Sequence, residues 1–168
     1  MKVTGVIDED FNHYQKPSLL ISMPKCNGKC GKDKCHNSHL MREEPISIDD
    51  NIIITKYLSN DLTSAIVFAG LEPFDSWYEM YGFIKKFRQV SNDDIVIYTG
   101  YTEEELFYSV GSLIEFPNII VKFGRYIEGH EKHYDAILGM DLASDNQYAK
   151  VIGGDYFAEN RGNIYHPR

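Results

Sequence analysis

The sequence holds three cysteines, Cys26, Cys30 and Cys35, and all of them fall within one ten-residue segment. An odd number of closely spaced thiols does not suit a set of disulfides, whereas clustered thiolates are typical ligands of a soft metal ion or an iron-sulfur cluster. Gly28 and Gly31 lie between the cysteines and give the backbone the freedom to wrap around a compact group. The segment therefore predicts a thiolate metal site.

The number of thiols indicates which metal group fits. Three thiolates hold three irons of a 4Fe-4S cluster and leave the fourth iron open, and an open iron is what a chemically active cluster requires. Four lysines in the same loop favour thiolate over thiol and make the loop too polar for cysteines that serve only as core side chains. A structural zinc ion, bound by the three cysteines and either His36 or His39 in a small interaction module, is the alternative.

Composition excludes several classes of partner. The formal net charge is −8 and no stretch is dense in lysine or arginine, so we expect no nucleic-acid binding. No run approaches the roughly 18 apolar residues that a membrane span needs, and the first residues lack an apolar signal core. Together with the cysteine usage, this predicts a cytoplasmic protein without membrane association. The length fits a single domain over residues 1–168.

The elements that must position the cysteines follow from the hydrophobic pattern. Apolar or β-rich runs predict strands within residues 17–24, 61–70, 94–98, 118–122, 134–138 and 148–152. Helical patterns cover residues 52–58, 75–90 and 102–111. Alternating strands and helices indicate an α/β fold with a mostly parallel sheet.

The carboxyl ends of parallel strands lie at one edge of a sheet, and ligand sites form from the loops there. The first predicted strand ends directly before the cysteines, and the loops at Glu72 and Gly100 follow the next two strands. We therefore expect these three loops to converge on one site.

Five short motifs follow one another along the chain at residues 35–37, 68–75, 98–101, 123–126 and 142–147. They read Cys-His-Asn, FAGLEPFD, YTGY, FGRY and LASDNQ. In this order they resemble the Cys-aromatic-Asn, Gly-Gly-Glu/Asp-Pro, Thr-Gly-Tyr, Asp-Gly-Arg-Phe and Gly-Ser-Ser-Asn-Gln segments of one family. That family is the activating enzyme of the anaerobic, glycyl-radical ribonucleotide reductase, within the radical S-adenosylmethionine (SAM) superfamily.

The chain departs from the pattern of that family at four points. The cysteine spacing has two more residues before the last cysteine than the commoner radical-SAM spacing. Leu71 stands where a second glycine is usual, and Phe123 stands where an aspartate is usual. Lys34 replaces an aromatic residue that often lies near adenine, so adenine contacts would come from the backbone or from His36.

The resemblance implies a fold and a reaction. The fold would be a partial (β/α)6 barrel of mostly parallel strands, and the cofactors would be a 4Fe-4S cluster on the three cysteines and SAM. The enzyme would reductively cleave SAM to a 5′-deoxyadenosyl radical and generate the glycyl radical on anaerobic ribonucleoside-triphosphate reductase. Its partners would be the glycyl-radical subunit of that reductase and a low-potential electron donor such as flavodoxin or ferredoxin. Activation of another glycyl-radical enzyme is the alternative.

The resemblance also implies which residues contact SAM: Lys34, His36, Asn37, Gly70, Leu71 and Glu72. Gly70 and Leu71 would present backbone groups to the amino-acid part of SAM. Glu72 has two interpretations, as an acceptor for the ammonium group of SAM or as a cap of the following helix. Asn37 either orients SAM or closes an Asx turn. A contact with SAM and a simple polar turn both remain open for Ser144, Asn146 and Gln147.

Overall fold

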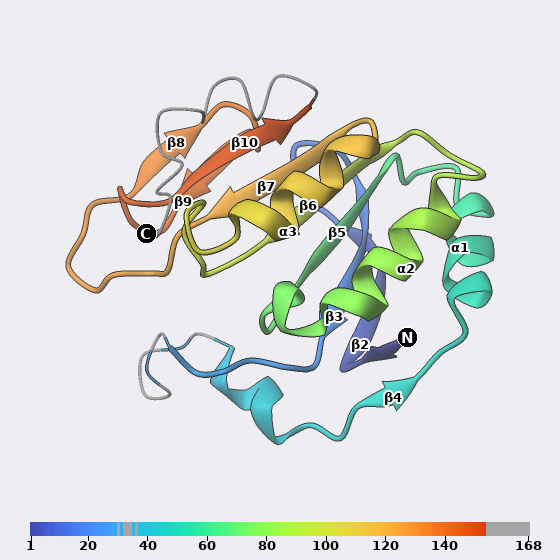
Figure 1. The fold of residues 1–168 in the computed structure, drawn as a ribbon, viewed down its shortest axis with the longest axis horizontal. Coiled ribbons are helices and arrows are strands. Elements are labelled where there is room, and N and C mark those ends of the chain that lie inside the picture. Colours follow the sequence, from blue (N-terminus) through green and yellow to red (C-terminus); the bar gives the residue numbers. More distant parts are fainter. Residues whose placement is uncertain (30, 32–34, 36, 154–168) are drawn as a thin grey trace, which may run out of the picture.

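A six-stranded sheet forms the centre of the molecule (Figure 1). The computed structural model describes residues 1–29, 31, 35 and 37–153. The four central strands are parallel: β3 (Ser18–Met23), β5 (Ala65–Gly70), β6 (Asp94–Tyr98) and β7 (Ile119–Phe123). The edge strands β2 (Gly5–Asp10) and β10 (Tyr148–Ile152) pair antiparallel with β3 and β7. The order β10-β7-β6-β5-β3-β2 brings the carboxyl ends of the parallel strands to one edge.

Shorter elements surround this sheet. Two small antiparallel pairs join β1 (Lys2–Val3) to β4 (Ile46–Ser47) and β8 (His133–Asp135) to β9 (Met140–Leu142). The α-helices are α1 (Asp50–Leu58), α2 (Trp77–Phe87) and α3 (Phe107–Gly111). Three short 3-10 helices are η1 (Ser38–Arg42), η2 (Pro73–Ser76) and η3 (Ser112–Glu115). Across the described ranges, none of the helices is both long and apolar enough to cross a bilayer.

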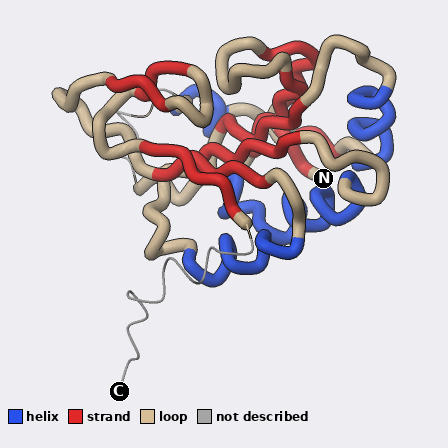
Figure 2. The backbone as a smooth tube through the Cα atoms, turned by 90° about the horizontal axis from the view of Figure 1, so that it is seen from above, coloured by secondary structure: helices blue, strands red, loops and turns tan. Residues whose placement is uncertain are grey.

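One face of the sheet packs against the helices. The parallel strands are buried on both faces, so side chains alternate between two separate clusters. On the helix side, Phe68 of β5 meets Phe83 of α2 with ring centroids 5.6 Å apart in an edge-to-face arrangement. Phe87 of α2 packs in the same cluster against Tyr57 of α1. Figure 2 shows the strands in the middle, with helices along one side and at one end.

The other face of the sheet carries smaller side chains. Ala65, Val67 and Ala69 of β5 all point to this side. Its buried cluster draws on strands and loops alone within the described residues, and Leu138 and Leu142 from the β8–β9 region cover part of it. Alanine and valine fill little volume, so space remains above β5 for a cavity.

The elements agree closely with the pattern of the sequence. The strands predicted within residues 17–24, 94–98 and 148–152 are β3, β6 and β10, and the predicted α/β sheet is mostly parallel. The helix predicted over residues 102–111 begins only at Phe107. The partial (β/α)6 barrel stays a prediction.

Local hydrogen bonds and composition explain the differences. Thr102 and Glu105 close a turn before α3, because each backbone N–H donates to the side chain of the other. The run at residues 134–138 is shortened to β8, because Asp135 is the last residue of that strand and its carboxylate accepts from the N–H groups of Ile137 and Leu138. The sequence did not predict strand β2, because acidic residues, which are uncommon in strands, occupy much of its sequence GVIDED.

Replacement of Phe83 by alanine tests the packing between α2 and the sheet. Phe83 is fully buried, so Phe83→Ala should lower the free energy of unfolding by about 3–4 kcal/mol through lost burial and the cavity that remains. Tyr78→Ala on the same helix is the matched control, because Tyr78 is 89% exposed, and it should cost less than about 1 kcal/mol. Urea denaturation followed by circular dichroism measures both. Equal losses would contradict this packing.

Candidate metal centre and adjoining cavity

The cysteine loop leaves the carboxyl end of β3 and opens onto a cavity. Cys26 and Cys35 are both half-buried, and both line the same cavity of about 500 Å³. Gly28 and Gly31 have φ angles of 73° and 82°, which a tightly turning loop requires. The N–H of Gly28 donates to the sulfur of Cys26 at 3.3 Å. Three predicted site residues lie outside the described part of the chain: Cys30, Lys34 and His36.

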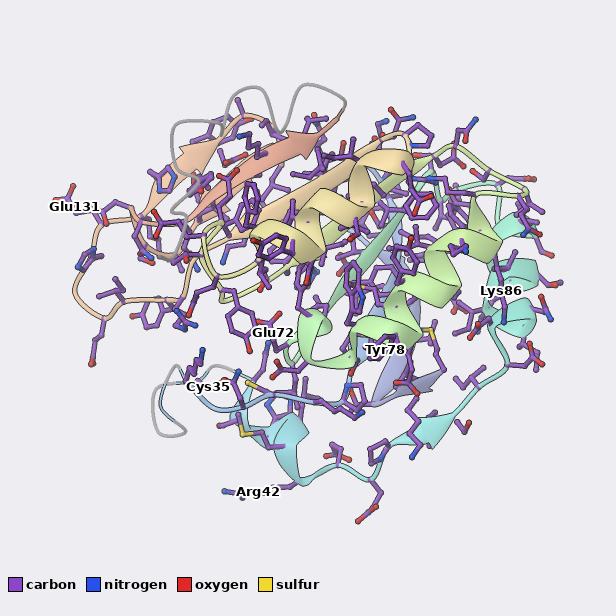
Figure 3. All side chains as sticks on the ribbon, in the orientation of Figure 1. Cys35, Arg42, Glu72, Tyr78, Lys86 and Glu131 are labelled. Carbon is purple, nitrogen blue, oxygen red and sulfur yellow. The ribbon has the colours of Figure 1, made fainter. Side chains whose placement is uncertain are left out.

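The cavity forms where the loops after all four parallel strands meet. Cys26 and Cys35 belong to the loop after β3, while Glu72, Gly100 and Arg125 follow β5, β6 and β7. Figure 3 shows Cys35 and Glu72 near one another, in agreement with their place in the lining of the same cavity. The volume lies within the range of about 300–1,000 Å³ that small-molecule pockets occupy. The convergence expected from the sequence is therefore present, and a ligand of that size can lie beside the thiols.

The cavity also extends across the face of the sheet that carries small side chains. Tyr98 of β6 lines it, and Asn12 and His13 reach it from the loop after β2. The buried Lys122 of β7 lines it too, and its ammonium donates to the carbonyl of Gly124 at 2.8 Å. Sequence reasoning did not single out Lys122, although a lysine inside the apolar run IIVKF is a visible signal.

Gly70 lets the end of β5 approach the end of β3 closely. Its φ angle is 82°, and a Cβ atom there would lie 2.3 Å from the hydroxyl oxygen of Ser22. Its carbonyl accepts a hydrogen bond of 2.6 Å from the side-chain amide of Asn37. Asn37 therefore ties the cysteine loop to β5. Leu71 is buried with a negative φ angle, which explains why this position tolerates a side chain.

Glu72 is a buried carboxylate in the lining of the same cavity. Its Oε1 atom accepts from the N–H of Phe74 at 3.1 Å and from the hydroxyl of Thr99 at 2.8 Å, and its Oε2 atom accepts from the N–H of Gly100 at 2.9 Å. The bond to Phe74 caps η2, and the other two join the loop after β5 to the loop after β6. Burial raises the pKa of Glu72 to about 7, although these hydrogen bonds act in the opposite direction.

A second group of side chains holds the first half of the cysteine loop. The N–H of Asn27 donates to Asp75 at 2.8 Å, its amide donates to the hydroxyl of Tyr101, and that hydroxyl donates to Asp75 at 2.7 Å. Burial and the bond to Asp75 raise the pKa of Tyr101, so the hydroxyl stays protonated as a donor. Asp75 and Tyr101 end the FAGLEPFD and YTGY motifs, so two of the five motifs meet at the cysteine loop.

The three polar residues near the C-terminal strand support the loop after β7. Gln147 accepts from the N–H groups of residues 143 and 144 and donates to the carbonyl of Gly124, and it also lines the cavity. Asn146 donates to the carbonyl of Arg125 at 2.8 Å, and the hydroxyl of Ser144 accepts from the N–H of Ile127. These bonds show a polar turn that shapes the wall of the cavity.

The described residues bring two thiols to the cavity without a complete metal site. Across residues 1–29, 31, 35 and 37–153, no three His, Cys, Asp or Glu side chains gather in a metal-binding group. His39, one of the two candidate zinc ligands, is exposed on η1. Among the described residues, the thiol ligands that line the cavity are therefore Cys26 and Cys35. Thiolates are soft ligands suited to an iron-sulfur cluster.

A thiol-bearing loop beside a cavity, at the carboxyl edge of a parallel sheet, defines an α/β protein with a thiolate cofactor site. The family described as "4Fe-4S single cluster domain" matches residues 18–150, so the chain belongs to this family and is an iron-sulfur protein. The matched residues run from β3 into β10 and include all three cysteines. Family membership thus confirms the expected iron-sulfur cluster. Neither the curated proteins nor the solved structures contain a match to the chain.

Replacement of Gly70 by alanine tests the close approach of β5 to β3. A Cβ atom at Gly70 would meet Ser22 at 2.3 Å and would force an alanine to a positive φ angle, so Gly70→Ala should cost at least about 2 kcal/mol. Gly82→Ala in α2 is the matched control. A Cβ atom there has no neighbour within 4 Å, so this change should stabilise the protein by about 0.5–1 kcal/mol. The melting temperatures of both variants, measured by thermal unfolding, test this prediction. An unchanged melting temperature for Gly70→Ala would contradict the close approach of β5 to β3.

The pKa of Glu72 predicts a pH dependence of stability. Its pKa rises from 4.5 to about 7 on folding, so the folded chain binds more protons than the unfolded chain between these values. Stability should therefore fall as the pH rises from about 5 to 8, with Glu72 contributing up to roughly 3 kcal/mol of the loss. Glu72→Gln should remove this slope in urea denaturation of the cluster-free protein. Glu131→Gln, at an exposed position, should keep it. Parallel slopes for all three proteins would refute the assignment.

Proposed function

We propose that this iron-sulfur protein is a radical SAM enzyme that generates the glycyl radical on anaerobic ribonucleoside-triphosphate reductase. The observation that carries the proposal is the shared position of the thiols and the cavity at the carboxyl edge of the parallel strands. When bound, the reduced cluster supplies the electron that cleaves SAM to methionine and a 5′-deoxyadenosyl radical. The chain itself binds, orients and shields the reactants.

The residues near the thiols suit the amino-acid end of SAM. Gly70 lines the cavity with backbone atoms alone, and Leu71 adds a buried apolar side chain that excludes water. Glu72 also lines the cavity, but its carboxylate already accepts three hydrogen bonds. Its main contribution is therefore to hold the two loops in place, with its remaining acceptor capacity directed to an ammonium group.

Two further side chains of the cavity suit the polar groups of the same ligand. Lys122 brings a buried ammonium to the cavity, and Gln147 brings an amide group. A buried cation favours a carboxylate, because the surrounding low dielectric strengthens their attraction. The cavity therefore offers a cation on β7 and a carboxylate at Glu72, in keeping with the carboxylate and ammonium groups of the amino-acid part of SAM.

The two faces of the sheet differ in a way that supports the proposal. The helices pack on one face of the sheet, while the face with small side chains borders the cavity. A partial (β/α)6 barrel has this arrangement, with helices outside and the ligand on the inner face of curved parallel strands. We therefore assign the radical-SAM type of fold as part of the same proposal.

The partners form the last part of the proposal. The glycine that receives the radical belongs to the glycyl-radical subunit of the reductase, and flavodoxin or ferredoxin supplies the electron. The order of the five motifs favours this reductase over another glycyl-radical enzyme. The zinc module receives less support, because the chain belongs to a 4Fe-4S family.

Anaerobic reconstitution with iron and sulfide tests the chemistry. The brown protein should bind about four irons and four sulfides per chain, and its reduced electron paramagnetic resonance spectrum should change when SAM is added. Dithionite and SAM should then yield 5′-deoxyadenosine, measured by chromatography. Cys26→Ser and Cys35→Ser should abolish cluster binding and product formation.

His36→Ala and His39→Ala are the matched controls, since both should leave iron bound under the cluster assignment, whereas one of them should abolish metal retention under the zinc alternative. Candidate glycyl-radical enzymes are then added in turn, and the doublet signal of the glycyl radical is recorded. A signal on the ribonucleotide reductase supports the named target. A protein that holds only zinc, or that retains iron without forming 5′-deoxyadenosine, contradicts the proposed function.

A further inference from the structure

The segment between Cys26 and Cys30 depends on contacts with other loops for its conformation. Residues 24–28 adopt no regular secondary structure, so the backbone of this segment has few hydrogen bonds of its own. The main support for its centre comes through Asn27. The N–H of Asn27 donates to Oδ2 of Asp75 at 2.8 Å, and its side-chain amide donates to the hydroxyl of Tyr101.

Tyr101 is itself held firmly at the carboxyl edge of the sheet. Its N–H donates to the hydroxyl of Thr99 at 3.0 Å, and its carbonyl accepts from the N–H of Gly124 at 3.0 Å. Its hydroxyl donates to Oδ1 of Asp75 at 2.7 Å. The hydroxyl therefore accepts from the cysteine loop and donates to the segment after β5, and it joins three loops at one atom.

The ring of Tyr101 adds a contact at the residue next to Cys30. The ammonium of Lys29 lies 5.0 Å from the ring centroid, and the guanidinium of Arg125 lies 5.4 Å from it, both within cation-π range. The same two cations bind Glu105, with Arg125 reaching both carboxylate oxygens at 3.0 Å and Lys29 reaching one at 3.4 Å. Lys29 is thus directed toward the ring and its surroundings.

We infer that Tyr101 is a positioning residue for the iron-sulfur cluster, because its hydroxyl holds Asn27 and thereby fixes the backbone that follows the thiol of Cys26. The inference rests on the cluster that family membership assigns and does not require cleavage of SAM. It also gives the YTGY motif a physical role beyond packing.

Loss of the hydroxyl would release the loop more than it would weaken the fold. A phenylalanine keeps the ring contacts with Lys29 and Arg125, but the amide of Asn27 loses its acceptor and Oδ1 of Asp75 loses its donor. Asn27 is exposed, so water can replace the lost bond, and the backbone that follows the thiol of Cys26 is then held only through the N–H of Asn27. Cluster retention should therefore respond strongly and global stability weakly.

The test measures iron release from the reconstituted holoprotein, without SAM, into an excess of an iron(II) chelator. Release from Tyr101→Phe should be about three- to tenfold faster than from the unchanged protein, the effect expected from one lost hydrogen bond. Tyr108→Phe is the matched control, because Tyr108 is 84% exposed, and its release rate should not change. The melting temperature of cluster-free Tyr101→Phe should stay within about 3 °C of the unchanged protein.

Asn27→Ala removes the same hydrogen bond from the exposed side and guards against a folding defect in Tyr101→Phe. It should accelerate release to a similar extent. The double variant should release iron more slowly than two independent effects would give, because both changes break the bond between Asn27 and Tyr101, while each removes one further bond. The inference would be overturned if Asn27→Ala released iron at the same rate as the unchanged protein. It would also be overturned if the effects of the two changes on the release rate were fully additive in the double variant, or if Tyr108→Phe accelerated release as much as Tyr101→Phe. A chain that binds no iron overturns it together with the cluster. Retained iron without SAM cleavage refutes only the proposed function.

Discussion

The buried carboxylate of Glu72 is the constraint on which the site depends. Removing a carboxylate from water is costly, and only hydrogen bonds to its oxygens offset that cost. Here the donors come from η2 and from the loop after β6, so the same bonds that satisfy the carboxylate fix the two loops relative to each other. The raised pKa of Glu72 shows that burial outweighs this compensation. The pKa of this carboxyl group is therefore shifted away from its ordinary value, as is common for titratable groups at functional sites.

The cysteine loop depends in turn on this fixed edge. The N–H of Glu72 donates to the carbonyl of Lys25, and Asn37 donates to the carbonyl of Gly70, so both described ends of the loop attach to the segment after β5. Tyr101 and Asp75 hold the part in between. The cysteine loop has no regular structure of its own, and hydrogen bonds from neighbouring loops give it a defined position. Because these neighbouring loops begin at the ends of the parallel strands, the sheet fixes where the thiols lie.

Sequence reasoning succeeded where chemistry or pattern is local. Thiol number predicted the iron-sulfur cluster, and apolar runs predicted the strands and the convergence of their loops. It failed where the outcome depends on contacts between distant residues. Nothing in the sequence shows that Glu72 binds Gly100 or that Tyr101 binds Asn27, because each pair is formed by the parallel register of different strands. The roles of Cys30, Lys34 and His36 stay predictions, since these residues lie outside the described part of the chain.

Charge placement connects the cavity to the chemistry proposed for it. A chain with a formal charge of −8 opposes the further negative charge that thiolates bring, unless cations lie close to them. The structure places Lys122 and Arg125 in the wall of the cavity, and Lys29 within the cysteine loop. Arg125 and Lys29 share Glu105, and Lys122 is buried where screening by water is weak. Under the proposed function, the buried ammonium of Lys122 therefore interacts with the carboxylate of SAM, and the weak screening strengthens that attraction.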